Sequence, residues 1–442
     1  MDKLILGLFS TLLFVLSIPG TIALRNVLVI TLLITLLFSV FKNKDFNVFR
    51  ANKEYRAILY FLVIFILFVG LHSYFISQNI NWSLNEFRAH IVYPFIYFLI
   101  GILIAIHTKI SKKLSKEVVI TAVFFSIFAH ILYIDLVALD KLIHDGEMIR
   151  RYGGLATSPT VPNYLTNILL AILIGEFVYR KRTDNKILIV SDGLLYFLFV
   201  LCIFSTFVEA LRLGDMALVF LGISASILYL YDNKNFSKIN RRFTAFFIIF
   251  TLTIPLIYNI STDPRWAKLI ETVPLAIDSS NSQHWLDRSM PAPKTSSGYE
   301  VKGSNYERIA WAMKSLEIIY KNPLGIGYGR NSFGAALGNE YGSEYARTRT
   351  SHSSILDLTI GIGIFGTFLW LFVISKIASS GIKQYKRRYD FFSSFVLFLT
   401  LGFVGRSFVD ANMRDHMFLE FMIIFGLALH FMFLERTNIE TK

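Results

Sequence analysis

Long apolar runs follow one another along almost the whole chain, and short polar breaks between them hold most of the charged residues. A helix that crosses a bilayer needs about 20 mostly apolar residues. One soluble core could not bury so many runs, because 54% of the 442 residues are hydrophobic and the mean hydropathy is +0.54. The sequence therefore predicts an all-α polytopic membrane protein.

Twelve of these runs predict transmembrane helices. They lie near residues 4–22, 26–41, 57–77, 91–107, 118–139, 164–179, 187–207, 213–231, 243–258, 353–377, 391–408 and 417–434. The first run, from Leu4 to about Ala23, resembles a signal peptide. It lacks a convincing small-residue cleavage site, however, and the second run begins at once. We therefore expect the first run to be retained as a span.

Lysine and arginine are dense in the breaks that follow even-numbered spans. They are Lys42, Lys44, Arg50, Lys53 and Arg56; Lys109, Lys112, Lys113 and Lys116; Arg180, Lys181, Arg182 and Lys186; Lys234, Lys238, Arg241 and Arg242; and Lys383, Lys386, Arg387 and Arg388. The positive-inside rule assigns these breaks and both termini to the cytoplasm. The same rule explains most of the net charge of +13, so we expect no nucleic-acid partner.

The other breaks are short and face outward, except for residues 140–163 and a long stretch from about 259 to 352. The chain thus divides into residues 1–258 with nine spans, a large outer loop at 259–352, and residues 353–442 with three spans and a cytoplasmic C-terminus. Within the loop the pattern predicts an amphipathic helix from Tyr306 to Tyr320, which ends before Asn322-Pro323. A glycine-rich segment from Gly325 to Gly329 follows.

Arginine dominates where outward loops meet helices. These positions are Arg151, Arg212, Arg265, Arg308, Arg406 and Arg414. The guanidinium group is always charged, and its planar fork of donors matches phosphate oxygens, so a cavity lined by several arginines would suit a pyrophosphate-linked lipid. For any single arginine, an ion-paired or snorkelling role is the commoner alternative. Arg212 stands out because the Glu209–Asp215 break that holds it is short and barely polar.

His352 is the sharpest catalytic candidate. It follows Arg347, Arg349 and Ser351 and opens the tenth span, so we expect it at the outer mouth of the bundle. An imidazole with an ordinary pKa of about 6.5 can take a proton from an attacking hydroxyl. The alternative is a helix cap or surface residue. The single cysteine, Cys202, lies within an apolar run and predicts neither a disulfide nor a reactive thiol.

Metal and nucleotide motifs are weak or missing. His144, His284, His352 and His416 lack zinc-ligand spacing, and Asp145-Gly-Glu147 alone is a thin basis for a divalent site. The sequence has no Walker loop, GxSxG or HExxH motif, which argues against an ATP-driven pump or a membrane hydrolase of the common sorts. We expect neither a metal nor a cofactor. Charges gather at the outer ends of the spans instead of along a central path, which disfavours a flippase or transporter.

Three motifs together resemble one family of membrane enzymes. His352-Ser353, nine residues, Gly363-Ile-Phe-Gly366 fits H-[NSQ]-x9-G-x-x-[GTY]. Tyr306-Glu-Arg308-Ile-Ala-Trp311, followed by Asn322-Pro323-Leu-Gly325-Ile-Gly327, and Arg151-Tyr-Gly153-Gly154, leading to Pro162-Asn163, supply the other two. With twelve spans and the large loop between the ninth and tenth, the chain resembles O-antigen ligases, within the O-antigen ligase and polymerase superfamily. It departs from the family pattern R-x3-L, because Arg212 is followed by Met216 and preceded by leucine instead of the commoner serine.

The resemblance implies a GT-C-type fold in the bacterial inner membrane and a periplasmic active site. The implied reaction transfers a glycan polymer from undecaprenyl pyrophosphate to lipid A-core during lipopolysaccharide biosynthesis, without a metal and with inversion. Arg212, Arg308 and Arg265 would hold the donor pyrophosphate, and His352 would orient or deprotonate the acceptor hydroxyl. Ser353, Gly363 and Gly366 would support the motif, and the small residues would let helices pack closely. An O-antigen polymerase and a protein O-oligosaccharyltransferase of the same superfamily remain alternatives.

Overall fold

The computed structural model describes residues 1–43, 52–111, 113–209, 212–231, 269–278, 282–296, 298–301, 303–345 and 349–434, together with 253–254, 257–258 and 261. Within these ranges every regular element is a helix, and the one β-bridge, Lys294 to Glu300, is isolated. Eight of these helical segments are long and apolar enough to cross a membrane. The chain is therefore an all-α polytopic membrane protein, as predicted.

Eleven of the twelve predicted spans each correspond to a helix. These are α1 (Asp2–Val15), α2 (Ile22–Asn43), α3 (Lys53–Phe75), α5 (Tyr93–Ile110), α6 (Lys116–Asp145), α7 (Thr160–Thr183), α8 (Asp192–Glu209), α9 (Arg212–Tyr231), α15 (Ser354–Arg388), α16 (Phe391–Ser407) and α17 (Asp415–Leu434). Among them α1, α16 and the apolar part of α9 are shorter than a full span. Most of the predicted span 243–258 lies outside the described residues, so twelve spans stay a prediction.

The centre of the bundle is the contact between α5 and α17. Nearly all of α17 is buried. A Cβ atom added at Gly101 of α5 would lie 2.1 Å from the carbonyl oxygen of Ile423, and one added at Gly426 of α17 would lie 2.2 Å from that of Phe98. Glycine therefore lets the two helix backbones touch, which is the usual route to close packing between membrane helices.

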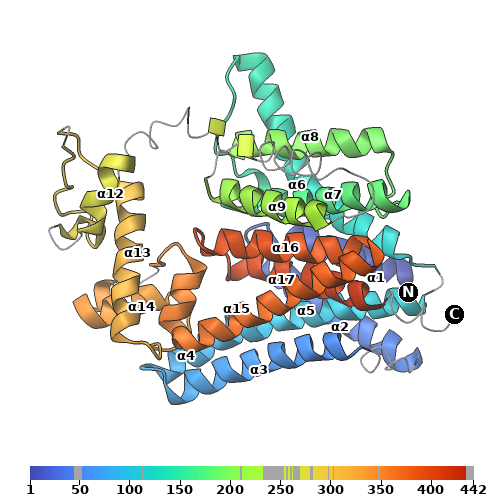
Figure 1. Cartoon of the computed structure of the whole chain (residues 1–442), viewed down its shortest axis with the longest axis horizontal. Coiled ribbons are helices and arrows are strands. Elements are labelled where there is room, and N and C mark those ends of the chain that lie inside the picture. Colours follow the sequence, from blue (N-terminus) through green and yellow to red (C-terminus); the bar gives the residue numbers. More distant parts are fainter. Residues whose placement is uncertain are drawn as a thin grey trace.

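The bundle has two chemically different ends. At the N-terminus, the Asp2 carboxylate accepts hydrogen bonds from Ser111 Oγ (2.8 Å) and His107 Nε2 (3.0 Å), so the break after α5 lies beside it. Three helices of the long loop gather at the opposite end: α12 (Leu269–Ile277), α13 (Gly303–Lys321) and α14 (Ser332–Tyr341) (Figure 1). We call the end with Asp2, His107 and Ser111 the basic end, and the end with α12, α13 and α14 the loop end.

The loop helices form a small core of their own. Trp285, Tyr306, Phe333 and Leu337 are buried in it. Helix α13 confirms the helix predicted from Tyr306 to Tyr320, and it ends at Lys321 immediately before Asn322-Pro323. A proline lacks the backbone N–H needed to continue a helix and restricts the residue before it, which accounts for this boundary.

A turn after α13 docks into a break in α15. Gly363 has φ +73° and interrupts the helix. The N–H groups of Ile326 and Gly327 donate to the carbonyls of Ile360 and Gly361, both at 3.0 Å, and the N–H of Ile364 donates to Pro323 O at 2.9 Å. The turn thus satisfies backbone groups that the break would otherwise leave unpaired in the helix.

These contacts partly correct the predicted role of the motif glycines. Gly363, and Gly361 two residues before it, face the turn instead of another spanning helix, and an added Gly363 Cβ would lie within 2.7 Å of Leu324 and Pro323 backbone atoms. Gly366 does face a spanning helix, because its Cβ would lie 2.6 Å from Phe68 of α3. Glycine at 361 and 363 therefore serves the docking of the loop, which spacing alone did not indicate.

Gly325→Ala tests this docking. Gly325 has φ +85°, and an added Cβ would lie 2.5 Å from both Gly361 O and Gly363 N, so neither the backbone conformation nor the space accommodates alanine. We expect a loss of about 1–3 kcal/mol of stability, measured as a lower melting temperature of the purified protein in detergent. Gly193→Ala, at the start of α8 with open space around it, is the control and should melt like the wild type. Equal melting of both variants would mean that the turn is not docked.

Candidate functional site

His352 lies in a tightly bonded turn that leads into α15. Its φ is +58°, a backbone conformation that costs a residue with a Cβ about 1 kcal/mol or more. The neighbours hold it: Ser351 N–H donates to Asp357 Oδ1 (3.0 Å), and Ser353 N–H donates to Ser351 Oγ (3.2 Å). The Ser353 side chain caps α15 by accepting from Leu356 N–H at 3.3 Å. Motif residue Ser353 therefore fixes the position of His352.

The His352 ring stacks on Trp311 of α13. The ring centroids are 5.3 Å apart and the planes differ by 10°. Trp311 is itself held, because its Nε1–H donates to the carbonyl of Trp285 at 3.0 Å. The structure thus brings together two motifs that lie about forty residues apart in the sequence, the one around Arg308 and Trp311 and the one that begins at His352.

The surroundings of His352 keep its imidazole neutral. Burial, followed by the positive charge of Arg308, lowers the pKa of His352 to about 4, whereas the Asp410 carboxylate acts in the opposite direction. A neutral imidazole at neutral pH can accept a hydrogen bond from a hydroxyl group. A base with so low a pKa removes a proton completely only with difficulty, because general bases work best when their pKa is near the working pH. The lowered pKa therefore suits His352 to accept a hydrogen bond better than to remove a proton completely.

Arg308 reaches this region from α13, one turn before Trp311, and is half-buried. The adjacent Glu307 is almost wholly buried and accepts two hydrogen bonds from Arg288, at 2.5 and 2.8 Å. This bidentate pair joins the segment that follows α12 to α13 and fixes the start of the helix that carries Arg308. Of the three arginines predicted to hold a pyrophosphate, Arg308 alone has a described side chain. Arg212 is the first residue of α9 but its side chain lies outside the described part, as does the whole of Arg265.

Arg406 lies inside the bundle, where it lines a small cavity of about 20 Å³ together with Tyr164 and Asn167. It is 1% exposed and donates to Asp410 Oδ2 (2.7 Å), Asn163 Oδ1 (2.8 Å) and Thr160 O (3.0 Å). Burying a guanidinium is costly unless it is paired and hydrogen-bonded, and here each bond is short. This arginine therefore joins α16 to α7 beneath the His352 turn.

The same network extends to the residues before Arg212. Asn163 Nδ2 donates to Glu209 Oε2 (2.9 Å), and Gly214 of α9 packs so closely on Asn163 that an added Cβ would lie 2.3 Å from its Nδ2. At the other end, Ser354 N–H donates to Asp410 O at 2.9 Å. A continuous chain of bonds thus links the end of α8 to the turn of His352. The sequence showed Arg406 and the Pro162-Asn163 motif, but Asp410 and Glu209 were missed.

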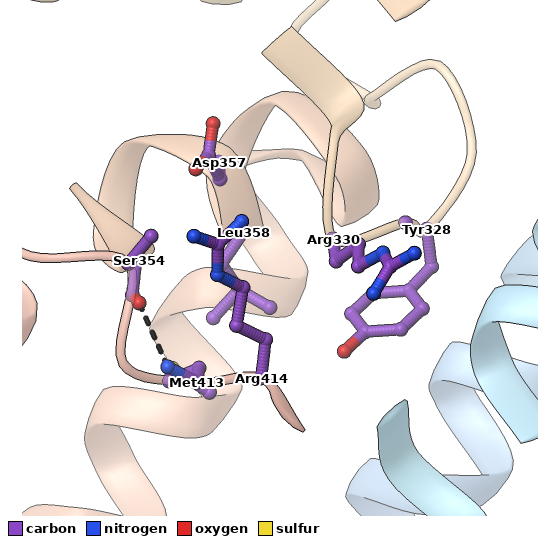
Figure 2. A pocket seen from close by; sticks show the side chains of 9 residues that line it. Tyr328, Arg330, Ser354, Asp357, Leu358, Met413 and Arg414 are labelled. Carbon is purple, nitrogen blue, oxygen red and sulfur yellow. Dashed lines mark hydrogen bonds between the residues drawn. The ribbon is translucent and has the colours of Figure 1, made fainter. Parts of the chain in front are cut away.

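A small cavity of about 20 Å³ lies beside the His352 turn (Figure 2). Tyr328, Arg330, Asp357, Leu358, Met413 and Arg414 are among the residues that line it. Figure 2 shows the Arg414 guanidinium extending toward the first turn of α15, where Asp357 and Leu358 lie. The volume suffices for one water-sized group.

No group of three or more His, Cys, Asp and Glu side chains that could hold a metal ion occurs among the residues that the structure describes.

Arg406→Lys tests the buried network. An ammonium group cannot reproduce the planar fork that reaches three partners, so Asn163 and Asp410 would lose bonds in a site without water access. We expect a loss of about 3 kcal/mol or more of stability, measured as a lower melting temperature. Arg387→Lys, at an exposed position at the basic end of α15, is the matched control and should leave the melting temperature unchanged. If Arg406→Lys melts at the wild-type temperature, the bonds of Arg406 do not contribute to stability as expected.

No protein-family model matches the chain, and no curated protein matches its sequence.

Proposed function

We propose that this chain is an O-antigen ligase, a metal-independent glycosyltransferase that moves a glycan polymer from undecaprenyl pyrophosphate to lipid A-core. One observation carries the proposal: His352 stacks on Trp311 with Arg308 close enough to depress its pKa. The ligase-like histidine motif and the R-x-x-W helix are thereby parts of one site. That site lies at the loop end of the bundle, away from the N-terminus (Figure 1).

In the proposed reaction the arginine side chains hold the donor. Arg308, together with Arg212 and Arg265, would donate hydrogen bonds to the pyrophosphate oxygens and stabilise the negative charge that grows as the glycosidic bond breaks. Neutral His352 would accept a hydrogen bond from the acceptor hydroxyl and hold its oxygen in line with the anomeric carbon. A single displacement of this kind inverts the anomeric configuration.

The same proposal sets the orientation in the membrane. The lysine and arginine of the breaks at the basic end would face the cytoplasm. The loop end, with α12, α13, α14 and His352, would then face the periplasm of a bacterium, where both lipid-linked substrates are exposed. Membrane lipids would surround the exposed apolar faces of the outer helices.

The pH dependence tests the role of His352. Only the neutral imidazole can accept the hydroxyl hydrogen bond, so kcat/KM should stay constant as the pH falls to about 5 and should drop through the lowered pKa of about 4. Removing the positive charge of Arg308 by Arg308→Gln should raise the pKa of His352 and move this acid limb to higher pH. The position of the limb is measured with purified protein across a buffer series. If the acid limb lies at the same pH in both proteins, Arg308 does not lower the pKa of His352.

His352→Ala should reduce transfer by about a hundredfold or more, the usual contribution of a positioned acid–base group. His144→Ala is the control, because His144 is an exposed histidine near the loop-end terminus of α6. Full transfer by the alanine variant at position 352, with normal protein levels, would remove His352 from the mechanism.

Deletion of the gene in its native host tests the reaction class. The expected result on a lipopolysaccharide gel is bare lipid A-core, with long polymer still attached to undecaprenyl pyrophosphate. Core capped by a single repeat unit would instead identify a polymerase. An unchanged ladder would exclude both and direct the search to protein glycosylation or another surface glycan.

A further inference from the structure

Two of the residues that line the cavity beside the His352 turn each have a buried polar atom without a hydrogen bond. Asp357 is 6% exposed. Its Oδ1 accepts from Ser351 N–H, and its Oδ2 is buried without a hydrogen bond of normal geometry, although the Phe333 backbone N–H lies near the carboxylate. Arg414 Nε is also buried without a hydrogen bond, with Asp415 Oδ2 3.8 Å away, and both side chains line the same cavity (Figure 2). Leaving such groups unsatisfied costs free energy, so each calls for a partner.

The fold holds both groups firmly in place. Ser354 Oγ accepts from Met413 N–H at 2.9 Å, a bond drawn in Figure 2, which ties the segment before Arg414 to the first turn of α15. Across the cavity, Ser83 Oγ donates to Tyr328 O at 2.9 Å and anchors the segment after the docked turn to α4 (Ile80–Phe87). The cavity walls therefore come from three fixed segments.

The charges around the cavity argue against an anion. Arg330 pairs with Asp415 at 3.0 Å and with Glu86 at 4.0 Å, and Arg414 lies 3.8 Å from Asp415. With Asp357 included, two guanidinium groups therefore lie near three carboxylates. Even with Asp357 protonated the charges only balance, so a phosphate would find no surplus of positive charge here.

A neutral hydroxyl fits these features better. It donates its proton to a carboxylate oxygen such as Asp357 Oδ2 and accepts from a guanidinium N–H such as that of Arg414. Leu358 and Met413 supply apolar walls for neighbouring C–H groups. A volume of about 20 Å³ admits one group of this size and no whole sugar ring.

We infer that Asp357 and Arg414 form a subsite that binds one hydroxyl group of the acceptor sugar, next to the hydroxyl that His352 orients. The position supports this assignment, because Asp357 lies on the first turn of α15 and is hydrogen-bonded to the residue before His352. The inference rests on the proposed glycosyl transfer. It adds a specificity determinant, since an acceptor without that hydroxyl would leave two polar groups unpaired.

Steady-state transfer by the purified protein in lipid nanodiscs tests the inference. The probes are lipid A-core and undecaprenyl-pyrophosphate glycan, both isolated from the deletion strain. Asp357→Asn preserves the size and the oxygen that meets Ser351, but it loses the charged acceptor. We expect it to raise the KM for lipid A-core by about tenfold or more, as for a lost hydrogen bond to a charged group, with the KM for the donor unchanged. Arg414→Gln should do the same.

Asp140→Asn is the matched control, because Asp140 is 71% exposed near the loop-end terminus of α6 and should leave both KM values unchanged. An unaltered KM for lipid A-core in both Asp357→Asn and Arg414→Gln would overturn the subsite. A rise in the donor KM alone would overturn its assignment to the acceptor. If Asp357→Asn fails to fold, Arg414→Gln decides. Absence of transfer by the wild type would instead refute the proposed function, which keeps the two failures distinguishable.

Discussion

The site depends on backbone hydrogen bonds between the Pro323–Gly327 turn and the break in α15. α13 ends directly before this turn, so the docking fixes where Arg308 and Trp311 lie relative to His352. His72 Nε2, from α3, is 2.6 Å from Leu324 O, and Gln78 N–H donates to Ile326 O at 2.9 Å. The turn is thus held by α15 on one side, and by α3 and the segment that follows it on the other. The turn and the C-terminal end of α13 are thereby fixed against the bundle.

At the loop end, several buried positions hold polar groups where apolar side chains of similar size would often be at least as stable. Arg406, Asp410, Asn163 and Glu209 are all buried, and each is paired. Such a network is stable only when every member is satisfied, so it has few alternative arrangements. The network therefore fixes how α7, α8, α9 and α16 pack against one another. The turn that carries His352 is bonded to the same network.

The sequence predicted the spanning helices well because bilayer length and apolar content leave few alternatives. It also predicted α13, whose C-terminus is imposed by Pro323, and it singled out His352 and Arg308. It could not predict that Trp311 stacks on His352, or that Gly361 and Gly363 receive a loop turn, because both depend on contacts between distant segments. Asp357 and Asp410 were missed for the same reason. An acidic residue near a helix end is usually solvated, and only tertiary packing buries it.

The contact between α5 and α17 also bears on how the protein is made. Gly101 lies against Ile423 and Leu427, more than three hundred residues further along the chain. During synthesis α5 is therefore made long before α17. Until α17 is made, Gly101 faces lipid or a translocation factor. Because α17 lies C-terminal to the other described helices, the central position of the bundle is filled only after those helices have been made. The segment containing Asp410 and Arg414 leads into α17, so we expect the His352 turn to reach its final position only after α17 has packed against α5.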